Sequence, residues 1–226
     1  MAGEPESLST HEPLAERIVR HDFDRLLMLS DGVFAIAITL LALELKLPEH
    51  WDGSLPGLIE GAGRPLLGYV FAFLLVGAFW IAHRRMFAKM VKVDRLVSLS
   101  NLLILGLIGL APFVARLIAE KGPSKAIPVY LTLTGLIFII YALIFVWSGK
   151  SGLLHPEIDR KQWRRECIGL VVGGGAILSG GIASLVLKSR PSPMGLMLIA
   201  LAAALAARFS RRGVVVPAQT SSTSRP

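Results

Sequence analysis

The sequence has a single cysteine, Cys167, in 226 residues. One cysteine excludes an intrachain disulfide and any Cys-x-x-Cys metal or redox pair, so cysteine usage does not indicate the compartment. The five histidines have no spacing, among themselves or with carboxylates, that is typical of a metal site. No serine lies in a Gly-x-Ser-x-Gly elbow, and Gly149-Lys150-Ser151 is not a phosphate loop because Ile144 stands where glycine is required. The residues therefore predict no enzyme and no resident cofactor.

Charged residues are also scarce, at 18% of the chain against 53% hydrophobic residues, with a mean hydropathy of +0.61. Several uncharged runs approach the roughly 20 apolar residues that cross a bilayer. The formal net charge of +8 comes from Lys and Arg scattered over short connections rather than gathered in one basic domain, which argues against a nucleic-acid partner. We predict an all-α integral membrane protein.

The hydrophobic runs predict six membrane-spanning helices in one transmembrane domain, residues 25–209. The spans are residues 26–43, 66–82, 96–117, 126–147, 167–187 and a short, alanine-rich 194–207. Residues 1–24 are predicted as a flexible or surface-lying start to the first helix, and residues 210–226 as a disordered tail.

Prolines and glycines divide these spans. Pro48, Pro56 and four glycines predict a loop of about twenty residues between the first and second spans. Pro112 predicts a bend near the end of the third span. In the fifth span, Gly169 and Gly173 have the small-xxx-small spacing that lets helices approach closely.

The distribution of basic residues predicts the orientation. Most of the 24 Lys and Arg residues lie in the two terminal segments and in the second and fourth inter-span loops. The positive-inside rule then places both termini in the cytoplasm. The first 24 residues contain six acidic residues, unlike the basic head of a signal peptide, so we expect the first span to be retained.

The first span carries an acid. From Leu26 to Leu43 the only ionisable residue is Asp31. Because a carboxylate is costly in the hydrocarbon region, its presence there indicates a functional site. Asp31 could pair with Arg25 or with a polar neighbour, because a buried acid has to be paired. Alternatively it could carry protons in a proton-coupled secondary transporter, although the sequence contains no visible inverted repeat.

A second feature of the same span is a stripe at helical spacing, formed by Ile36, Thr39, Leu40 and Leu43. Ile36 lies about 15 Å beyond Leu26, near the middle of a hydrocarbon core of about 30 Å, and on a different face from Asp31. One interpretation is that the stripe packs or faces lipid while Thr39 bonds its own backbone. The other is that several copies of the helix surround an axis, since apolar rings can gate ions by dewetting.

Motifs in the first half of the chain resemble a known family. The segment Arg25-x-x-x-Leu29-Ser30-Asp31 is similar to the Arg-x-x-x-Phe-Ser-Asp signature of the transmembrane protein 175 family of lysosomal and prokaryotic potassium channels, with leucine in place of phenylalanine. The later motifs that resemble the family are Trp80-x-x-His83, Asn101-Leu-Leu and Pro112-Phe113.

The resemblance implies a passive, potassium-permeable homotetramer in a prokaryotic cell membrane, with six helices per chain and the first helix lining the pore. It implies that Ile36 forms the narrowest constriction, that Leu40 and Leu43 form further apolar rings, and that Thr39 favours potassium. A third possibility, a membrane scaffold without a permeation pathway, stays open at this point.

The resemblance also casts a set of polar residues as a network that orients the first helix. These residues are Arg25, Ser30, Asp31, His83 and Asn101. Trp80 is expected to be a membrane-interface or packing residue. The expected partners are other copies of the chain, membrane lipid and permeating potassium ions.

Overall fold

The computed structural model describes residues 14–46 and 52–187. This part of the chain forms six α-helices: α1 (Leu14–Ala42), α2 (Leu55–Phe87), α3 (Arg95–Ile108), α4 (Ala111–Lys121), α5 (Pro123–Lys150) and α6 (Arg160–Val186). Five helical segments are long and apolar enough to cross a membrane, with α3 and α4 counted together as one. The all-helical, multi-pass class is therefore confirmed. The predicted span at 194–207 and the tail at 210–226 lie outside the described residues.

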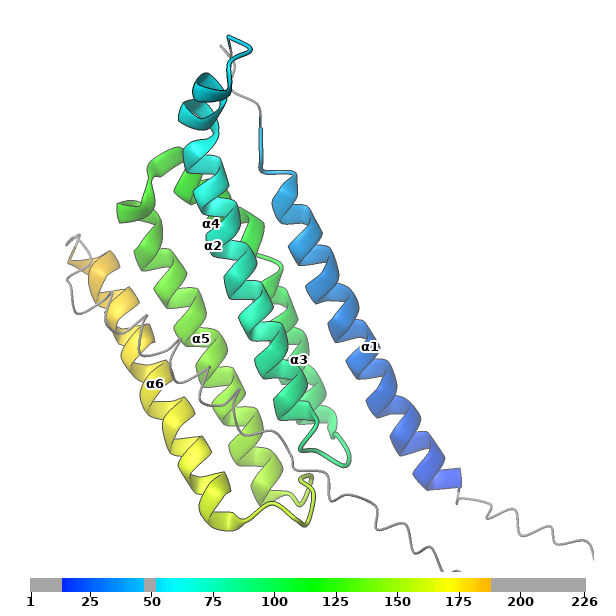
Figure 1. Cartoon of the computed structure of the whole chain (residues 1–226). Coiled ribbons are helices and arrows are strands. Elements are labelled where there is room, and N and C mark those ends of the chain that lie inside the picture. Colours follow the sequence, from blue (N-terminus) through cyan, green and yellow to red (C-terminus); the bar gives the residue numbers. More distant parts are fainter. Residues whose placement is uncertain (1–13, 47–51, 188–226) are drawn as a thin grey trace, which may run out of the picture.

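The helices stand side by side along a common direction (Figure 1). Helix α1 lies at one edge of the bundle, where it contacts α2, α3 and α4, and the α5–α6 hairpin lies at the other edge. One end of the bundle, the lower end in Figure 1, carries the start of α1, the connection from α2 to α3 and the connection from α5 to α6. Position at an edge leaves α1 with a side that no other described helix covers.

Helix α2 begins well before the predicted second span, so the expected loop of about twenty residues is wrong. Ser54 caps the helix, since its Oγ accepts a hydrogen bond from the Gly57 amide at 3.0 Å. Pro56 lies in the first turn, where its missing amide proton leaves no helical hydrogen bond unmade. Glycine in a helix costs about 1 kcal/mol relative to alanine, which weakens but does not prevent helix formation.

The third span is divided by a break rather than a smooth bend. Helix α3 ends at Ile108 and α4 begins at Ala111, with Pro112 in the first turn of α4. Proline has no amide proton to donate to the carbonyl four residues earlier, so the helix is interrupted just before it. The sequence predicted the position of the bend, and the structure has two separate helices there.

The α5–α6 hairpin is packed through glycines. A Cβ atom at Gly135 would lie 2.5 Å from the backbone nitrogen of Leu178, and one at Gly181 would lie 2.6 Å from that of Thr132. By contrast, a Cβ at Gly169 would meet nothing within 4 Å. Close approach in the fifth span was therefore predicted correctly, but not through Gly169.

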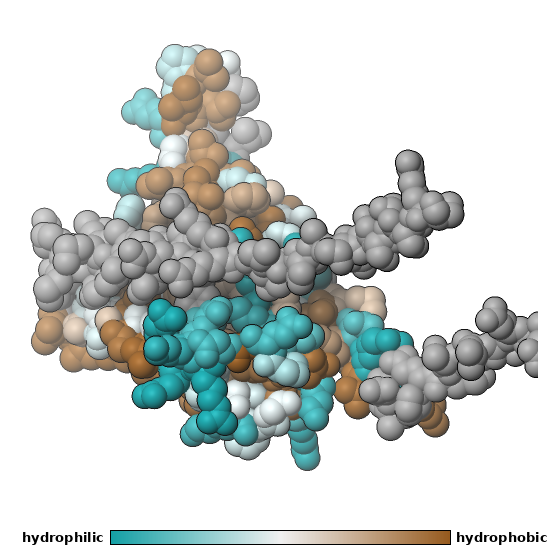
Figure 2. Space-filling view, turned by 60° about the horizontal axis from the view of Figure 1, so that its bottom comes forward, coloured by the Kyte–Doolittle hydropathy of each residue, from teal (hydrophilic) through white to brown (hydrophobic). Residues whose placement is uncertain are grey.

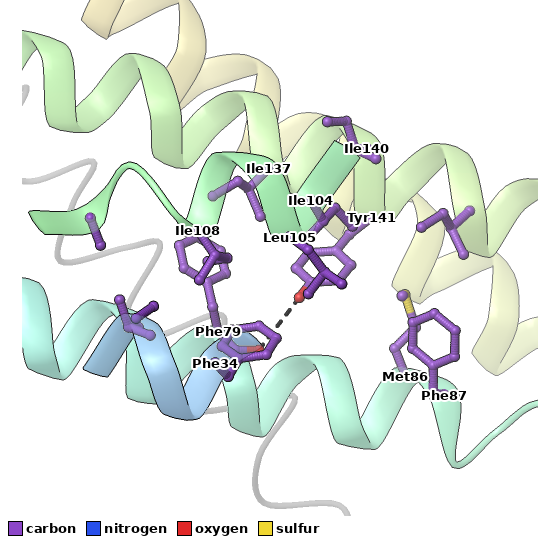
Figure 3. Close-up of a cluster of buried hydrophobic side chains, with 14 of the residues drawn as sticks. Phe34, Phe79, Met86, Phe87, Ile104, Leu105, Ile108, Ile137, Ile140 and Tyr141 are labelled. Carbon is purple, nitrogen blue, oxygen red and sulfur yellow. Dashed lines mark hydrogen bonds between the residues drawn. The ribbon is translucent and has the colours of Figure 1, made fainter. Parts of the chain in front are cut away.

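The main hydrophobic core lies where α1, α2, α3 and α5 meet (Figure 3). Phe34 of α1, Phe79 of α2 and Ile108 of α3 belong to this cluster, and Tyr141 of α5 donates a hydrogen bond from its hydroxyl to the Phe79 carbonyl at 3.4 Å. This core determines which side of α1 is turned inward.

Candidate functional site

The inward side of α1 is a narrow stripe of small and apolar residues. Ser30, Phe34, Ala37 and Leu41 are all buried, at spacings of four, three and four residues. These spacings keep the four side chains on one face of an α-helix. The face matches the surface offered by α2, α3 and α4, so it fixes the rotation of α1 about its own axis.

The opposite side of α1 carries the predicted stripe. Ile36 is 58% exposed, Leu40 is 43% exposed and Leu43, one residue beyond the helix, is 71% exposed. Thr39 is exposed as well, and its hydroxyl donates to the Ile36 carbonyl at 2.9 Å. Within one chain these four side chains therefore do not pack into the core.

Three of the predicted network residues do meet inside the protein. The Asn101 side-chain nitrogen donates to Ser30 Oγ at 2.9 Å, and Asn101 Oδ1 lies 2.8 Å from His83 Nε2. Ser30 Oγ in turn donates to the Leu26 carbonyl at 2.8 Å. All three side chains are almost fully buried.

The order of donors along this chain follows from the available protons. The single Ser30 hydroxyl proton goes to Leu26, so Ser30 Oγ accepts from Asn101. Asn101 then presents its oxygen to His83, and that oxygen requires a proton on His83 Nε2. The hydrogen bonds run from α2 through α3 to the α1 backbone, so they connect three helices at one depth.

Aromatic rings surround His83. The Phe87 ring is stacked on the imidazole at 4.4 Å between centroids, and Phe34 meets it edge-on at 5.4 Å. Such rings exclude water from the hydrogen bonds of His83, which strengthens them and raises the cost of losing one partner.

Asp31 has a different partner from Arg25. Its Oδ1 accepts a hydrogen bond from the indole nitrogen of Trp80 at 2.8 Å, and the Arg84 guanidinium lies 4.9 Å from the centroid of the Trp80 ring. Arg25 is exposed and makes no hydrogen bond or ion pair with another residue in the ranges 14–46 and 52–187. Asp31 is thus tied to α2, and Arg25 does not join the network within a single chain.

Trp80 is the residue whose role the sequence did not reveal. It was expected to be a membrane-interface or packing residue, but its indole bonds the acid of the first span. The signal was present in the spacing, because residues 80 and 83 lie one turn apart on α2 and residues 30 and 31 are adjacent on α1. Asp31 therefore meets Trp80 of α2 directly, and Ser30 is connected to His83 of α2 through Asn101 of α3.

These features define a multi-pass α-helical membrane protein whose edge helix is attached by a polar network and exposes an apolar stripe. A family profile described as Endosomal/lysosomal potassium channel TMEM175 matches residues 25–112. A protein of Streptomyces collinus named a potassium channel is 32% identical over 162 residues, which cover 68% of this chain and 79% of that protein. The chain therefore belongs to the TMEM175 family.

A solved structure and a vertebrate relative extend the comparison. The crystal structure of a lysosomal potassium-selective channel TMEM175 homolog from Chamaesiphon minutus matches with a TM-score of 0.64 and 25% identity, covering 84% of this chain and 97% of that one. A Gallus gallus protein named an endosomal/lysosomal proton channel is 29% identical over 59% of this chain, but only 29% of its own length is covered.

Proposed function

We propose that this protein is a passive, potassium-permeable cation channel in which α1 helices from four copies of the chain surround a central pore. The observation that carries the proposal is the pair of opposite faces on α1, one buried in the bundle and one exposing Ile36, Thr39, Leu40 and Leu43. An edge helix with a free apolar stripe can meet its copies around an axis. The potassium channels among the relatives support the same interpretation.

In this assembly Ile36 forms the narrowest ring. An apolar constriction blocks ions because water leaves it, so ions would have to enter without hydration. Leu40 and Leu43 form further apolar rings, and four Thr39 hydroxyls replace part of the water around potassium, which dehydrates more easily than sodium. Hydroxyls are weaker ligands than a cage of carbonyl groups, so we expect modest selectivity.

The polar network holds α1 at the rotation that this pore requires. Ser30, His83 and Asn101 connect α1 to α2 and α3, and Asp31 connects it to Trp80. Arg25 is assigned to the same orienting role in the assembled channel, where its exposed side chain can meet a neighbouring copy. A small rotation of α1 would exchange pore-facing and packed side chains.

In the proposed topology the chain crosses the cell membrane six times, and both termini lie in the cytoplasm. The start of α1, the connection from α2 to α3 and the connection from α5 to α6 lie at the same end of the bundle (Figure 1). Basic residues lie in or next to these two connections, namely Lys89, Lys92, Arg95, Lys150 and Arg160. The positive-inside rule assigns that end to the cytoplasm.

The test of the proposed function is Ile36→Asn in proteoliposomes. A polar ring lets water remain in the constriction, so potassium flux is expected to rise several-fold. Leu143→Asn is the matched control, because Leu143 is an exposed residue of α5, a helix that does not carry the proposed pore stripe. Equal or lower flux in well-folded Ile36→Asn protein would contradict the proposal.

A second candidate function is proton movement, which the names of the vertebrate relatives favour. Asp31 is exposed in a single chain, so it is available to exchange protons. A saturable potassium flux that requires a proton gradient and is lost in Asp31→Asn would identify a proton-coupled transporter. Proton flux that continues without potassium and without saturation would identify a proton channel, and an absence of any flux would identify a scaffold.

A further inference from the structure

The end of the bundle where α6 begins carries a concentrated positive charge. Hydrophilic side chains gather on this end of the molecule (Figure 2). Its exposed basic residues are Arg84, Lys92, Arg95, Lys150, Arg160, Lys161, Arg164 and Arg165. The exposed acids are Glu157 and Asp159 in the connection from α5 to α6, and Asp22, Asp24 and Asp31 on the first part of α1, where Arg17, Arg20 and Arg25 are exposed as well. The surface therefore keeps a strong net positive charge, and we call it the basic end.

The two connections at the basic end are fixed to each other. Residues 90 and 154 form an isolated antiparallel bridge, the Val91 amide donates to the Leu153 carbonyl at 2.9 Å, and the His155 amide donates to the Lys89 carbonyl at 2.9 Å. Lys89 also forms an ion pair with Glu166 of α6. The positive charges are therefore presented by a defined surface rather than by independent loops.

Three of the cations continue an exposed apolar stripe of α6. Lys161, Arg164 and Arg165 are followed on the same helical face by Ile168, which is 58% exposed, and Val172, which is 64% exposed. The spacing places positive charge at the end of the helix and exposed apolar side chains immediately beyond it. This order corresponds to the headgroup and acyl regions of one lipid leaflet.

The two arginines of this stripe have N–H groups that no other described residue uses as hydrogen-bond donors. The Arg165 Nε donates to the Lys161 carbonyl at 3.3 Å, which leaves its terminal nitrogens available. Arg164 makes no hydrogen bond or ion pair with any residue of 14–46 or 52–187. One guanidinium group can donate two parallel hydrogen bonds to the oxygens of one phosphate group. Guanidinium groups are also more weakly hydrated than ammonium groups.

We propose that Lys161, Arg164 and Arg165 bind the headgroup of an anionic phospholipid whose acyl chains lie along Ile168 and Val172. Charge complementarity selects the anionic headgroup, and the adjoining apolar face selects a lipid over a soluble anion. The positive-inside rule alone requires basic residues in loops. It does not require that they continue the exposed apolar face of a helix, which is what a bound lipid would use.

The experiment compares three forms of the full chain in neutral detergent. The test variant is Lys161→Gln, Arg164→Gln and Arg165→Gln together. The control is Arg64→Gln, Lys121→Gln and Lys125→Gln, which removes the same charge from exposed positions at the opposite end of the bundle. Thermal unfolding and native mass spectrometry are measured with added dioleoylphosphatidylglycerol or dioleoylphosphatidylcholine.

The wild type and the control variant are expected to unfold at higher temperature with phosphatidylglycerol than with phosphatidylcholine. The test variant should lose this difference and bind phosphatidylglycerol at least about tenfold more weakly, since each surface cation contributes measurably to anionic lipid binding. Arg164→Lys with Arg165→Lys, which keeps the charge, should retain most of the effect.

Three results would overturn the proposal. One is an equal response of the wild type to the two lipids, and another is an equal loss in the test and control variants, which would indicate a response to net charge. The third is the same stabilisation by inorganic phosphate at matched concentration, which would indicate a soluble-anion site. None of these measurements depends on ion conduction, so the result is separate from the proposed function.

Discussion

The α5–α6 hairpin and the attachment of α1 are built in opposite ways. The hairpin brings two backbones together through Gly135 and Gly181, where there is no space for a side chain. Helix α1 is attached through a narrow apolar stripe and a short series of hydrogen bonds centred on Asn101. The hairpin therefore depends on shape, and the attachment of α1 depends on a few polar pairs.

This difference matters for a helix that is proposed to line a pore. Inside a membrane the lipid is as apolar as leucine, so helix association relies on close packing and on hydrogen bonds rather than on hydrophobic burial. Glycine contacts give the hairpin an extended interface. Directional hydrogen bonds give α1 a specific rotation while leaving its other face, with Ile36, free.

The largest expected effect is on the glycine interface. Gly135→Ala places a methyl group where Leu178 backbone atoms lie 2.5–2.6 Å away, so the helices must separate. We expect a loss of about 3 kcal/mol or more in the free energy of unfolding, since overpacking typically costs about 1–3 kcal/mol and backbone cannot move aside easily. Unfolding in mild detergent measures it.

Gly175→Ala is the matched control for this change. It lies in α6 with nothing within 4 Å of an added Cβ, so the same substitution should leave stability unchanged or raise it by up to about 1 kcal/mol. Similar losses for the two variants would show that the hairpin does not depend on close approach at residue 135.

The next effect is on the polar attachment of α1. Asn101→Leu keeps the approximate size of the side chain but leaves buried polar atoms of Ser30 and His83 without their partner. We expect a loss of about 2 kcal/mol, the cost of unsatisfied buried groups. Ser98→Ala, which removes only a hydroxyl bond to the Asp94 carbonyl near the start of α3, should cost less. If the two variants were equally stable, the network would not be a main attachment of α1.

A smaller effect is expected at Trp80. Trp80→Phe removes the indole donor to Asp31 and keeps an aromatic ring, so we expect a loss of about 1 kcal/mol. Asp31→Asn retains an acceptor oxygen and should cost less than Trp80→Phe. A double-mutant cycle measures the coupling directly, and additive losses would mean that the two residues act independently.

The smallest effect on stability is expected on the free face of α1. Thr39→Val keeps the shape of the side chain, and the exposed hydroxyl bonds only the Ile36 carbonyl within the helix. Stability should change by less than about 0.5 kcal/mol. The potassium-to-sodium permeability ratio in bilayer recordings should fall more than the total conductance, whereas Thr39→Ser should preserve it. An unchanged ratio in Thr39→Val would remove Thr39 from the proposed selectivity site.

Part of the candidate site was predictable from the sequence. The signature around Ser30 and Asp31 indicated polar contacts of the first helix, and His83 and Asn101 were expected in the same network. The structure joins Ser30, Asn101 and His83 by hydrogen bonds, and their role in orienting the first helix stays a prediction. The partner of Asp31 was not predictable, because Trp80 lies 49 residues away and an indole nitrogen can bond an acid or remain at a membrane interface.

Helix boundaries were less predictable than the membrane-spanning segments themselves. The glycines and prolines between residues 53 and 65 were expected to form a loop, yet helix α2 includes Leu55 onward. The low helix propensity of these glycines is outweighed by the side-chain cap at Ser54 and by the long apolar helix that follows. The break before Pro112 was predictable because the missing amide proton is a property of one residue.

The sequence by itself determined that this is a helical membrane protein. The length and hydropathy of each apolar run are local properties, and a sufficiently long apolar run crosses a bilayer as a helix whatever its neighbours are. The sequence also determined the positions of the polar residues on α1. Only the tertiary structure decided that Phe34 faces inward and Ile36 outward, that Trp80 holds Asp31, and that Gly135 rather than Gly169 is where the helices touch. Those outcomes depend on which distant helices meet, and that is settled by packing over the whole bundle.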